Sequence, residues 1–288
     1  MKSSKRFRDG SRRSSASASS TIAWSFTASH STATAKSETE SSQLRAAIRS
    51  LLLLLLFAVI CPIHVATKHL LGKSAWPKRF LGIAARIVGA RPIVIGDALD
   101  PHTLLISNHV SWLDILILGG TTGTAFVSKD NLGHGVIHWL ADQNHTLYVR
   151  REDRKGSRDQ AMAIARAAER AQPIALFPEG TTGPGDHLLP FRSSLLEATS
   201  YASANVQIRP VVLDYGPAAT EVGWHGESGK ENVLRILGRK GTLPVIVHLL
   251  PPLDRTSDRK ALAQKARDAI AETLASSRGS APLYPDHR

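Results

Sequence analysis

Short apolar runs alternate with amphipathic stretches from about residue 92 to the end of the chain. Seven of these runs have the length and composition of strands, and they cover residues 92–95, 103–107, 125–128, 147–149, 174–177, 208–213 and 245–249. Two intervening stretches, at 158–171 and 193–204, have helical spacing, and a third at 261–276 closes the chain. Alternation of strands and helices predicts an α/β fold, a layered mixed sheet flanked by helices.

An apolar stretch precedes this region. The 18 residues between Arg49 and Lys68 carry no formal charge, and as a helix they would extend about 27 Å, close to the ~30 Å hydrocarbon core of a bilayer. Pro62 and His64 interrupt the second half of the stretch, so spanning and interfacial attachment both stay open. We predict a helical membrane-associating segment at 45–73, with a buried core helix as the alternative.

The first 44 residues have a different composition. Ser, Thr and Ala dominate, and no periodic apolar face is present, which is typical of a disordered tail. The acid-poor, Arg-containing start also resembles an organellar transit peptide. The predicted organisation is therefore a disordered tail at 1–44, the membrane-associating segment at 45–73 and a catalytic domain at 74–288.

The net charge of +12 is unevenly distributed along the chain. Residues 1–100 hold 15 basic and 5 acidic side chains, a net +10, whereas residues 101–200 hold 9 and 10, a net −1. Because the excess lies around the apolar segment and lacks interleaved aromatic residues, it favours an anionic lipid surface over nucleic acid. A non-enzymatic basic protein that binds membranes or nucleic acid is the alternative class. The single cysteine, Cys61, excludes an internal disulfide.

The segment 104–114 carries the densest chemistry, with His109 and Asp114 five positions apart. In one continuous helix this spacing would set the two side chains about 140° apart, too far round the axis for contact. Ser111 followed by Asp114 has the capping-box pattern, which would start a helix at Trp112 and leave His109 in the preceding turn. Asp114 could then orient His109 as a general base; the alternative is that Asp114 only caps the helix.

A second group of polar residues follows the strand predicted at 174–177. Its members are Phe177, Pro178, Glu179, Gly180 and Thr181. This composition favours a tight loop whose amides and hydroxyls can hold a polar or phosphorylated ligand, although an ordinary turn has a similar composition.

Arginine follows the strand predicted at 147–149. Arg150 and Arg151 stand at its end, where a guanidinium is suited to bind a phosphate with two hydrogen bonds. A solvated charge run is the alternative reading. His134 and His138 have the spacing of a metal pair, but no Glu of a zincin and no third ligand accompany them, so we predict no metal site.

In this chain order the motifs resemble those of 1-acylglycerol-3-phosphate O-acyltransferases (lysophosphatidic acid acyltransferases), a family of glycerolipid acyltransferases. The matching residues are Asn108, His109, Ser111 and Asp114 in the first block, Arg151 in the second, Phe177 to Thr181 in the third and residues 208–211 in the fourth. The chain departs from the family pattern at Thr182, where Arg is common, and at Arg192 to Ser194, where Lys-x-Gly is usual.

The resemblance implies a glycerolipid acyltransferase-like fold and transfer of a fatty acyl chain from acyl-CoA or acyl-carrier protein to the hydroxyl of lysophosphatidic acid. His109 and Asp114 would be catalytic. The substrate-binding residues would be Arg151, Phe177, Pro178, Glu179, Gly180 and Thr181. No cofactor is expected besides the acyl donor as co-substrate. Another lysolipid, such as lyso-ornithine lipid, is the alternative acceptor.

The expected partners are membrane lipids and the acyl donor, with no nucleic acid; the sequence leaves the oligomeric state open. A membrane-associated enzyme with its active site on the cytoplasmic side is expected. The membrane would be the bacterial inner membrane, or an organellar membrane if the tail is a transit peptide.

Overall fold

The computed structural model describes residues 17–129, 135–149 and 157–279. Within these residues a seven-stranded sheet has the order β1-β7-β6-β2-β5-β3-β4. The strands are β1 Ala90–Ile95, β2 Thr103–Ser107, β3 Ala125–Lys129, β4 Leu147–Val149, β5 Ile174–Leu176, β6 Gln207–Asp214 and β7 Leu243–Leu249. Neighbouring strands are parallel except β6 and β7, which are antiparallel. The predicted mixed sheet and the positions of its strands are confirmed.

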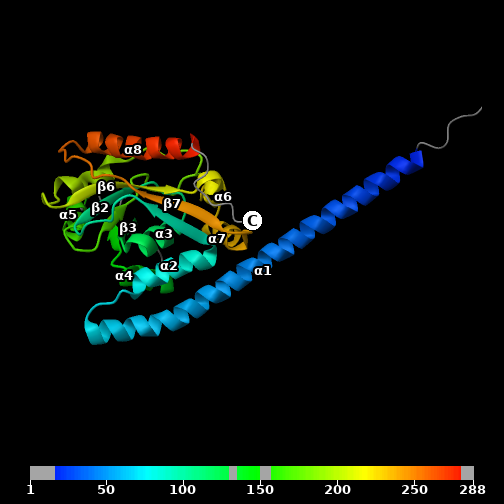
Figure 1. Cartoon of the computed structure of the whole chain (residues 1–288), viewed down its shortest axis with the longest axis horizontal. Helices are drawn as coiled ribbons and strands as arrows, with labels where there is room; N and C mark the ends of the chain where they lie inside the picture. Colours follow the sequence, from blue (N-terminus) through cyan, green and yellow to red (C-terminus); the bar gives the residue numbers. More distant parts are fainter. Residues whose placement is uncertain (1–16, 130–134, 150–156, 280–288) are drawn as a thin grey trace, which may run out of the picture.

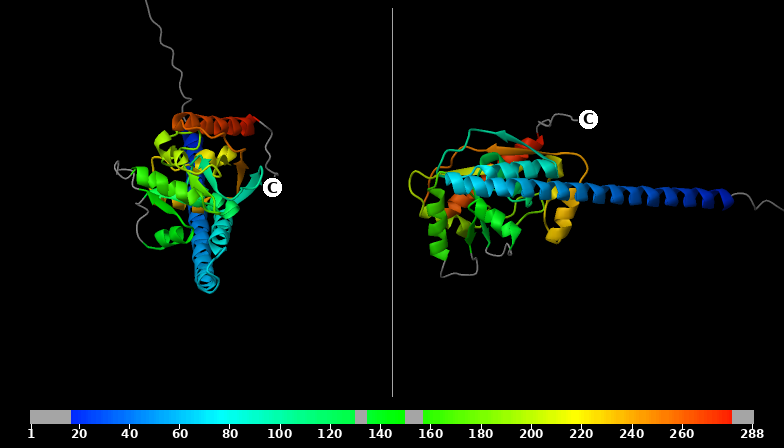
Figure 2. Two further views of the ribbon diagram at one scale, coloured as in Figure 1. Left: turned by 90° about the vertical axis from the view of Figure 1, so that its left-hand side faces the viewer. Right: turned by 90° about the horizontal axis from the view of Figure 1, so that it is seen from below.

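Helices cover both faces of this sheet (Figure 1). They are α1 Ser17–Leu71, α2 Trp76–Val88, α3 Leu113–Thr122, α4 Val136–Gln143, α5 Ser157–Ala168, α6 Ala219–Val222, α7 Gly229–Gly238 and α8 Arg259–Gly279, with 3₁₀ segments η1 Ser193–Ser200 and η2 Gly216–Ala218. The stretch predicted as a helix at 193–204 is the 3₁₀ segment η1. The views in Figure 2 agree that α2 lies on one side of the sheet and α8 on the other.

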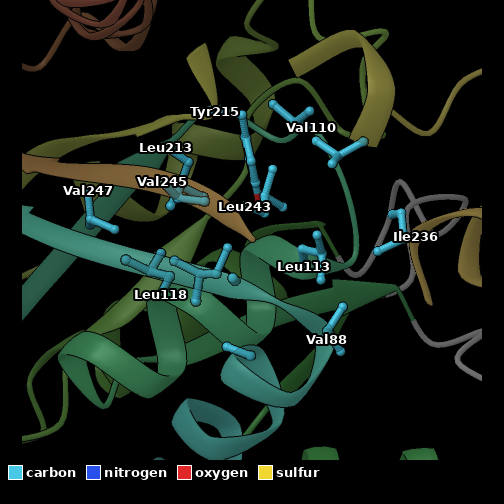
Figure 3. Packing of buried hydrophobic residues seen from close by; sticks show 14 of the residues in the cluster. Val88, Val110, Leu113, Leu118, Leu213, Tyr215, Ile236, Leu243, Val245 and Val247 are labelled. Carbon is cyan, nitrogen blue, oxygen red and sulfur yellow. The ribbon is translucent and has the colours of Figure 1, made fainter. Parts of the chain in front are cut away.

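Two hydrophobic cores lie on the two faces of the sheet. All five residues of β2 are buried, and successive side chains point to opposite faces. Leu105 packs in the core beneath α2 and α3, where Figure 3 shows Leu118 and Val245. Leu104 belongs to the other core, beneath α5 and α8. A parallel strand buried on both faces does not alternate apolar and polar residues, which explains why three apolar residues follow one another in the middle of β2.

Helix α1 is much longer than the segment predicted at 45–73. It begins at Ser17, inside the stretch predicted to be disordered, and passes the predicted boundary at residue 45 without a break. Residues 1–16 lie outside the described part of the chain. The portion Glu38–Leu71 is long and apolar enough to cross a membrane, with a mean hydropathy of 2.5. Only 11% of its most apolar window is buried, so α1 is not a buried core helix.

Two sets of hydrogen bonds hold α1 against the domain. The Arg45 Nε donates to the Gly238 carbonyl at 2.8 Å, and the Arg49 Nη1 donates to the Leu237 carbonyl at 2.9 Å, so both guanidinium groups lie at the carboxyl end of α7. Cations are favoured there because the last carbonyls of a helix lack partners. Near the other end of α1, Lys68 Nζ donates to Gln143 Oε1 of α4 at 3.0 Å. The apolar helix is therefore fixed to the domain at two points.

Candidate active site

The candidate site lies where β2 and β5 end. The two strands are parallel neighbours, so their carboxyl ends lie at the same edge of the sheet. His109 follows β2, which ends at Ser107, and the loop beginning at Phe177 follows β5. The loop is joined directly to the other segment, because the Gly183 amide donates to the His109 carbonyl at 2.8 Å. Sheet topology therefore brings together two motifs that are about 70 residues apart in the sequence.

His109 and Asp114 are in direct contact. Their Nδ1 and Oδ2 atoms are 2.8 Å apart, and Asp114 is completely buried in the first turn of α3. The same Oδ2 accepts the backbone amides of Val110 at 2.7 Å and Ser111 at 3.0 Å. His109 precedes the helix, as predicted, and the turn folds its ring back onto the carboxylate. Contact between the two side chains is confirmed.

The capping box predicted at the start of α3 forms only in one direction. Asp114 accepts the Ser111 amide, but the Ser111 hydroxyl accepts the Leu113 amide at 3.4 Å. The helix begins at Leu113, one residue later than predicted. Asp114 therefore both caps the helix and orients His109, so the two readings of this carboxylate apply together.

Hydrogen bonding assigns the tautomer of His109. Ionised Asp114 only accepts, so the proton of a neutral His109 imidazole lies on Nδ1 and Nε2 is the free base. The ring also stacks on Phe177, with centroids 4.1 Å apart and planes 17° from parallel. These two contacts hold the imidazole in one orientation, as a general base requires.

Tyr215 is a third member of this group that the sequence did not reveal. Its buried hydroxyl donates to Asp114 Oδ1, the oxygen that His109 does not use. Burial, followed by the negative charge of Asp114, raises the pKa of Tyr215 well above its ordinary value, so the hydroxyl stays a donor. Figure 3 shows the side chain in the core near Val110. No motif points to a tyrosine 101 residues beyond the carboxylate it contacts.

Replacing Tyr215 by phenylalanine is expected to lower kcat about tenfold, because a hydrogen bond to a charged group is lost while the ring is kept. The acidic limb of the pH profile of kcat/KM should move to higher pH, since an Asp114 carboxylate that has lost this donor stabilises the imidazolium more strongly. Tyr201→Phe, at an exposed tyrosine, is the matched control. A Tyr215→Phe enzyme with wild-type kcat and pH profile would contradict this role.

Glu179 holds the backbone of the site. Its Oε1 accepts the His109 amide at 2.7 Å, and its Oε2 accepts the Leu189 amide at 2.9 Å. Burial raises the pKa of this carboxyl group, and the two amide hydrogen bonds oppose that shift. Because both oxygens are engaged, the observed function of Glu179 is to fix the loop against His109. Its predicted contact with substrate stays a prediction.

The other loop residues lie around an open cleft of about 480 Å³, which we call the threonine cleft. Its lining includes His109, Lys129, Gly180, Thr181, Trp224 and His225. Gly180 has a φ of +77°, a left-handed conformation that favours glycine. Phe177 lines the cleft as well as supporting His109, whereas the Pro178 carbonyl accepts the Arg192 amide at 2.9 Å. Arg151 lies outside the described residues, so its predicted role stays a prediction.

Two other motif residues stabilise the sheet. The Asn108 amide group bonds in both directions with the backbone of Leu213, at 2.9 and 3.0 Å, which joins the ends of β2 and β6. Arg209, in the fourth block, is buried and donates to the carbonyls of Leu250 at 2.9 Å and Ala98 at 3.0 Å. Both side chains hydrogen-bond to backbone groups, and they therefore stabilise the part of the sheet that carries the site.

No group of three or more potential metal ligands occurs among the described residues. His138 lies 3.2 Å from Asp142 and stacks on Tyr148, and His134 lies outside the described part of the chain. The expected absence of a metal or cofactor stays a prediction.

The fold and the site define an α/β enzyme in which a histidine, oriented by a buried carboxylate, can take a proton from a substrate hydroxyl beside an open cleft. The family model described as Acyltransferase matches residues 91–214, which include both motifs.

Known proteins are similar over most of the chain. A lyso-ornithine lipid O-acyltransferase of Pseudomonas aeruginosa is 33% identical over 66% of this chain and 76% of its own length. Three other bacterial proteins with that name are 29–32% identical. A 1-acyl-sn-glycerol-3-phosphate acyltransferase of Neisseria gonorrhoeae is 26% identical over 71% of this chain and 79% of its own.

The fold also matches a solved structure. The crystal structure of the 1-acyl-sn-glycerophosphate (LPA) acyltransferase PlsC from Thermotoga maritima has a TM-score of 0.59, with 18% identity over 82% of this chain and 99% of that one. The chain belongs to the glycerolipid acyltransferase family, and the resemblance of its motifs is confirmed.

Proposed function

We propose that the protein is a lysolipid O-acyltransferase that moves a fatty acyl chain from a CoA or acyl-carrier-protein thioester to a free hydroxyl. The contact between His109 Nδ1 and Asp114 Oδ2 carries this proposal, because it leaves Nε2 free to act as a base.

The reaction follows from this geometry. An alcohol has a high pKa and attacks a thioester slowly unless a base removes its proton during attack. His109 Nε2 takes that proton, the hydroxyl oxygen forms a bond to the thioester carbon, and the carbon–sulfur bond breaks. The imidazolium, stabilised by Asp114, returns the proton to the leaving thiolate, so ester and thiol are the products. No acyl-enzyme is needed.

The preferred acceptor is lyso-ornithine lipid. The common Arg after the Phe177–Thr181 block is Thr182 here, and its hydroxyl donates to the Trp224 carbonyl at 2.8 Å. This position therefore supplies no cation for a phosphate and instead holds the loop at residue 224. The missing cation removes one ligand for a phosphate headgroup, and the relatives at 29–33% identity carry lyso-ornithine lipid in their names.

Lysophosphatidic acid is the second candidate, supported by the motif resemblance and by relatives named for that reaction. Purified protein in liposomes, given labelled acyl-CoA or acyl-carrier protein and a panel of lysolipids, separates the two. The highest kcat/KM is expected with lyso-ornithine lipid. A higher value with lysophosphatidic acid reassigns the acceptor, and no transfer to any lysolipid overturns the proposed function.

The proposed location is a membrane surface, with the active site on the cytoplasmic side, where both thioester donors are dissolved. The side chains of Leu51, Leu54, Leu55 and Val59 on α1 are 52–65% exposed, an apolar surface that is unfavourable in water. The concentration of positive charge before residue 101 suits the anionic headgroups beside it.

Replacing these four exposed apolar residues by glutamine is expected to move the protein from the membrane fraction to the soluble fraction. Each apolar side chain that enters the bilayer contributes about 1.5–3 kcal/mol to membrane binding, and the glutamines lose that contribution. The contacts of Arg45, Arg49 and Lys68 with the domain are kept, so the fold should survive. Removal of residues 1–44 is the control and should leave membrane binding intact. If the variant with all four substitutions stayed folded in the membrane pellet, attachment to the membrane through α1 would be contradicted.

A further inference from the structure

A second cleft reaches the general base from the other side. It has a volume of about 330 Å³ and lies between the loop at residues 183–188 and helix α8, so we call it the α8 cleft. Among the described residues, His109 is the only one that lines both the α8 cleft and the threonine cleft. The two clefts are therefore separate spaces that meet at the residue expected to move the proton.

The proposed reaction needs two such spaces. Without an acyl-enzyme, donor and acceptor must be bound together, with the thioester carbon and the attacking hydroxyl both next to His109. One cleft must then hold the lysolipid headgroup and the other the part of the donor that leaves with sulfur. This step rests on the proposed function.

Among the described residues that line the α8 cleft, Arg267 is the one Lys or Arg side chain. The three carboxylates of the lining are each held by other groups: Glu179 accepts two backbone amides, Asp214 accepts the Gly216 amide at 2.8 Å, and Asp186 pairs with His187 at 2.6 Å. Arg267, which lines the cleft from α8, is half-buried and makes no hydrogen bond or ion pair with any described residue. A guanidinium without such a partner is available to bind a phosphate with two hydrogen bonds.

The shape of the α8 wall suits a narrow chain. Arg267, Ala271 and Leu274 are spaced by four and three residues, so they lie along one face of the helix. The small side chain of Ala271 therefore stands between those of Arg267 and Leu274 along this wall. Since the cleft has both Arg267 and His109 in its lining, it offers one group for the phosphate and one for the thioester of a thin arm that carries both.

The location of the cleft separates the two substrates. Figure 1 shows α8 on the face of the sheet opposite to α1 and α2. The threonine cleft is lined by Trp224 and His225, which lead into α7, the helix that Arg45 and Arg49 of α1 contact. The α8 cleft is therefore lined by the helix that lies away from α1, where a water-soluble donor is expected, and the lipid acceptor is expected in the threonine cleft.

We propose that the α8 cleft binds the phosphopantetheine arm of the acyl donor and that Arg267 binds its phosphate. Acyl-CoA and acyl-carrier protein share this arm, so the site recognises the chemistry common to both. Arg267 is a substrate-binding residue outside the motifs that define the family resemblance.

Steady-state kinetics on the full-length protein in detergent micelles test the proposal. Arg267→Gln is expected to raise the KM for acyl-CoA about tenfold and to leave the KM for the lysolipid unchanged. The KM for acyl-pantetheine, which has no phosphate, should not change. Lys265→Gln, at an exposed cation on the same helix, is the matched control. Binding of free CoA, followed by calorimetry, should weaken by the same factor in Arg267→Gln.

The other outcomes are informative. A raised KM for acyl-carrier protein, with weak binding of free CoA to both proteins, supports the site and identifies the carrier protein as the donor. A raised KM for the lysolipid alone, or unchanged constants for both donors, overturns the proposal. If the wild type binds CoA in an Arg267-dependent way but acylates no lysolipid, the proposed function fails while the phosphate site stands.

Discussion

Replacing His109 by alanine is expected to lower kcat for acyl transfer by about 10²- to 10⁴-fold, the range that a general base contributes. The hydroxyl of the acceptor then has no group to take its proton, while the other lining residues of both clefts are kept. KM for donor and acceptor should change little, because binding in the clefts does not depend on the base. Rates measured with saturating acyl-CoA and lysolipid give this comparison directly.

The control for this variant is His138→Ala. His138 is also a partly exposed histidine next to a carboxylate, Asp142, but it lines neither cleft. Thermal unfolding curves of both variants, compared with that of the wild type, check that each variant is folded. If His109→Ala transferred acyl groups as fast as the wild type, the mechanism would be wrong.

Asp114→Asn is expected to have an effect of similar size, about 10⁴-fold on kcat, the loss seen when such a carboxylate is replaced in a serine-protease triad. The amide that replaces one carboxylate oxygen donates where an acceptor is needed. If it faces His109, it leaves the wrong imidazole nitrogen protonated. If it faces Tyr215, it opposes another donor. Stability should also fall by about 1–3 kcal/mol, because the amides of Val110 and Ser111 lose part of their shared acceptor.

Asp142→Asn, at a surface carboxylate, controls for the loss of charge. The double variant Asp114→Asn with Tyr215→Phe adds a further test. Since Tyr215 acts through Asp114, removing its hydroxyl in the Asp114→Asn background should cost little more activity. A fully additive loss in the double variant would mean that Tyr215 affects the reaction by another route.

Local patterns made the strands and the dyad predictable. Strands such as β2 are short apolar runs because their side chains are buried on both faces of a parallel sheet, and that burial can be read from the residues themselves. His109 and Asp114 are five residues apart, so the turn and helix start that join them are encoded within a few positions. Resemblance to a family then supplied the reaction.

Contacts between distant segments were not predictable in the same way. Tyr215 meets Asp114 only because β6 pairs with β2 in the sheet. The motif resemblance predicts that Glu179 binds substrate. In the structure its two oxygens accept the backbone amides of His109 and Leu189. Helix α1 extends to Ser17 through residues whose composition suggested disorder, which shows that composition alone did not locate its start.

The sequence by itself therefore determined the α/β class, the apolar helix and the contact between His109 and Asp114, since each depends on neighbouring residues. The tertiary structure decided what surrounds them: the tyrosine behind Asp114, the fixing of α1 by α7, and the two clefts that meet at His109. These features depend on which strands pair and which helices cover each face of the sheet, because only packing brings such residues within hydrogen-bonding distance.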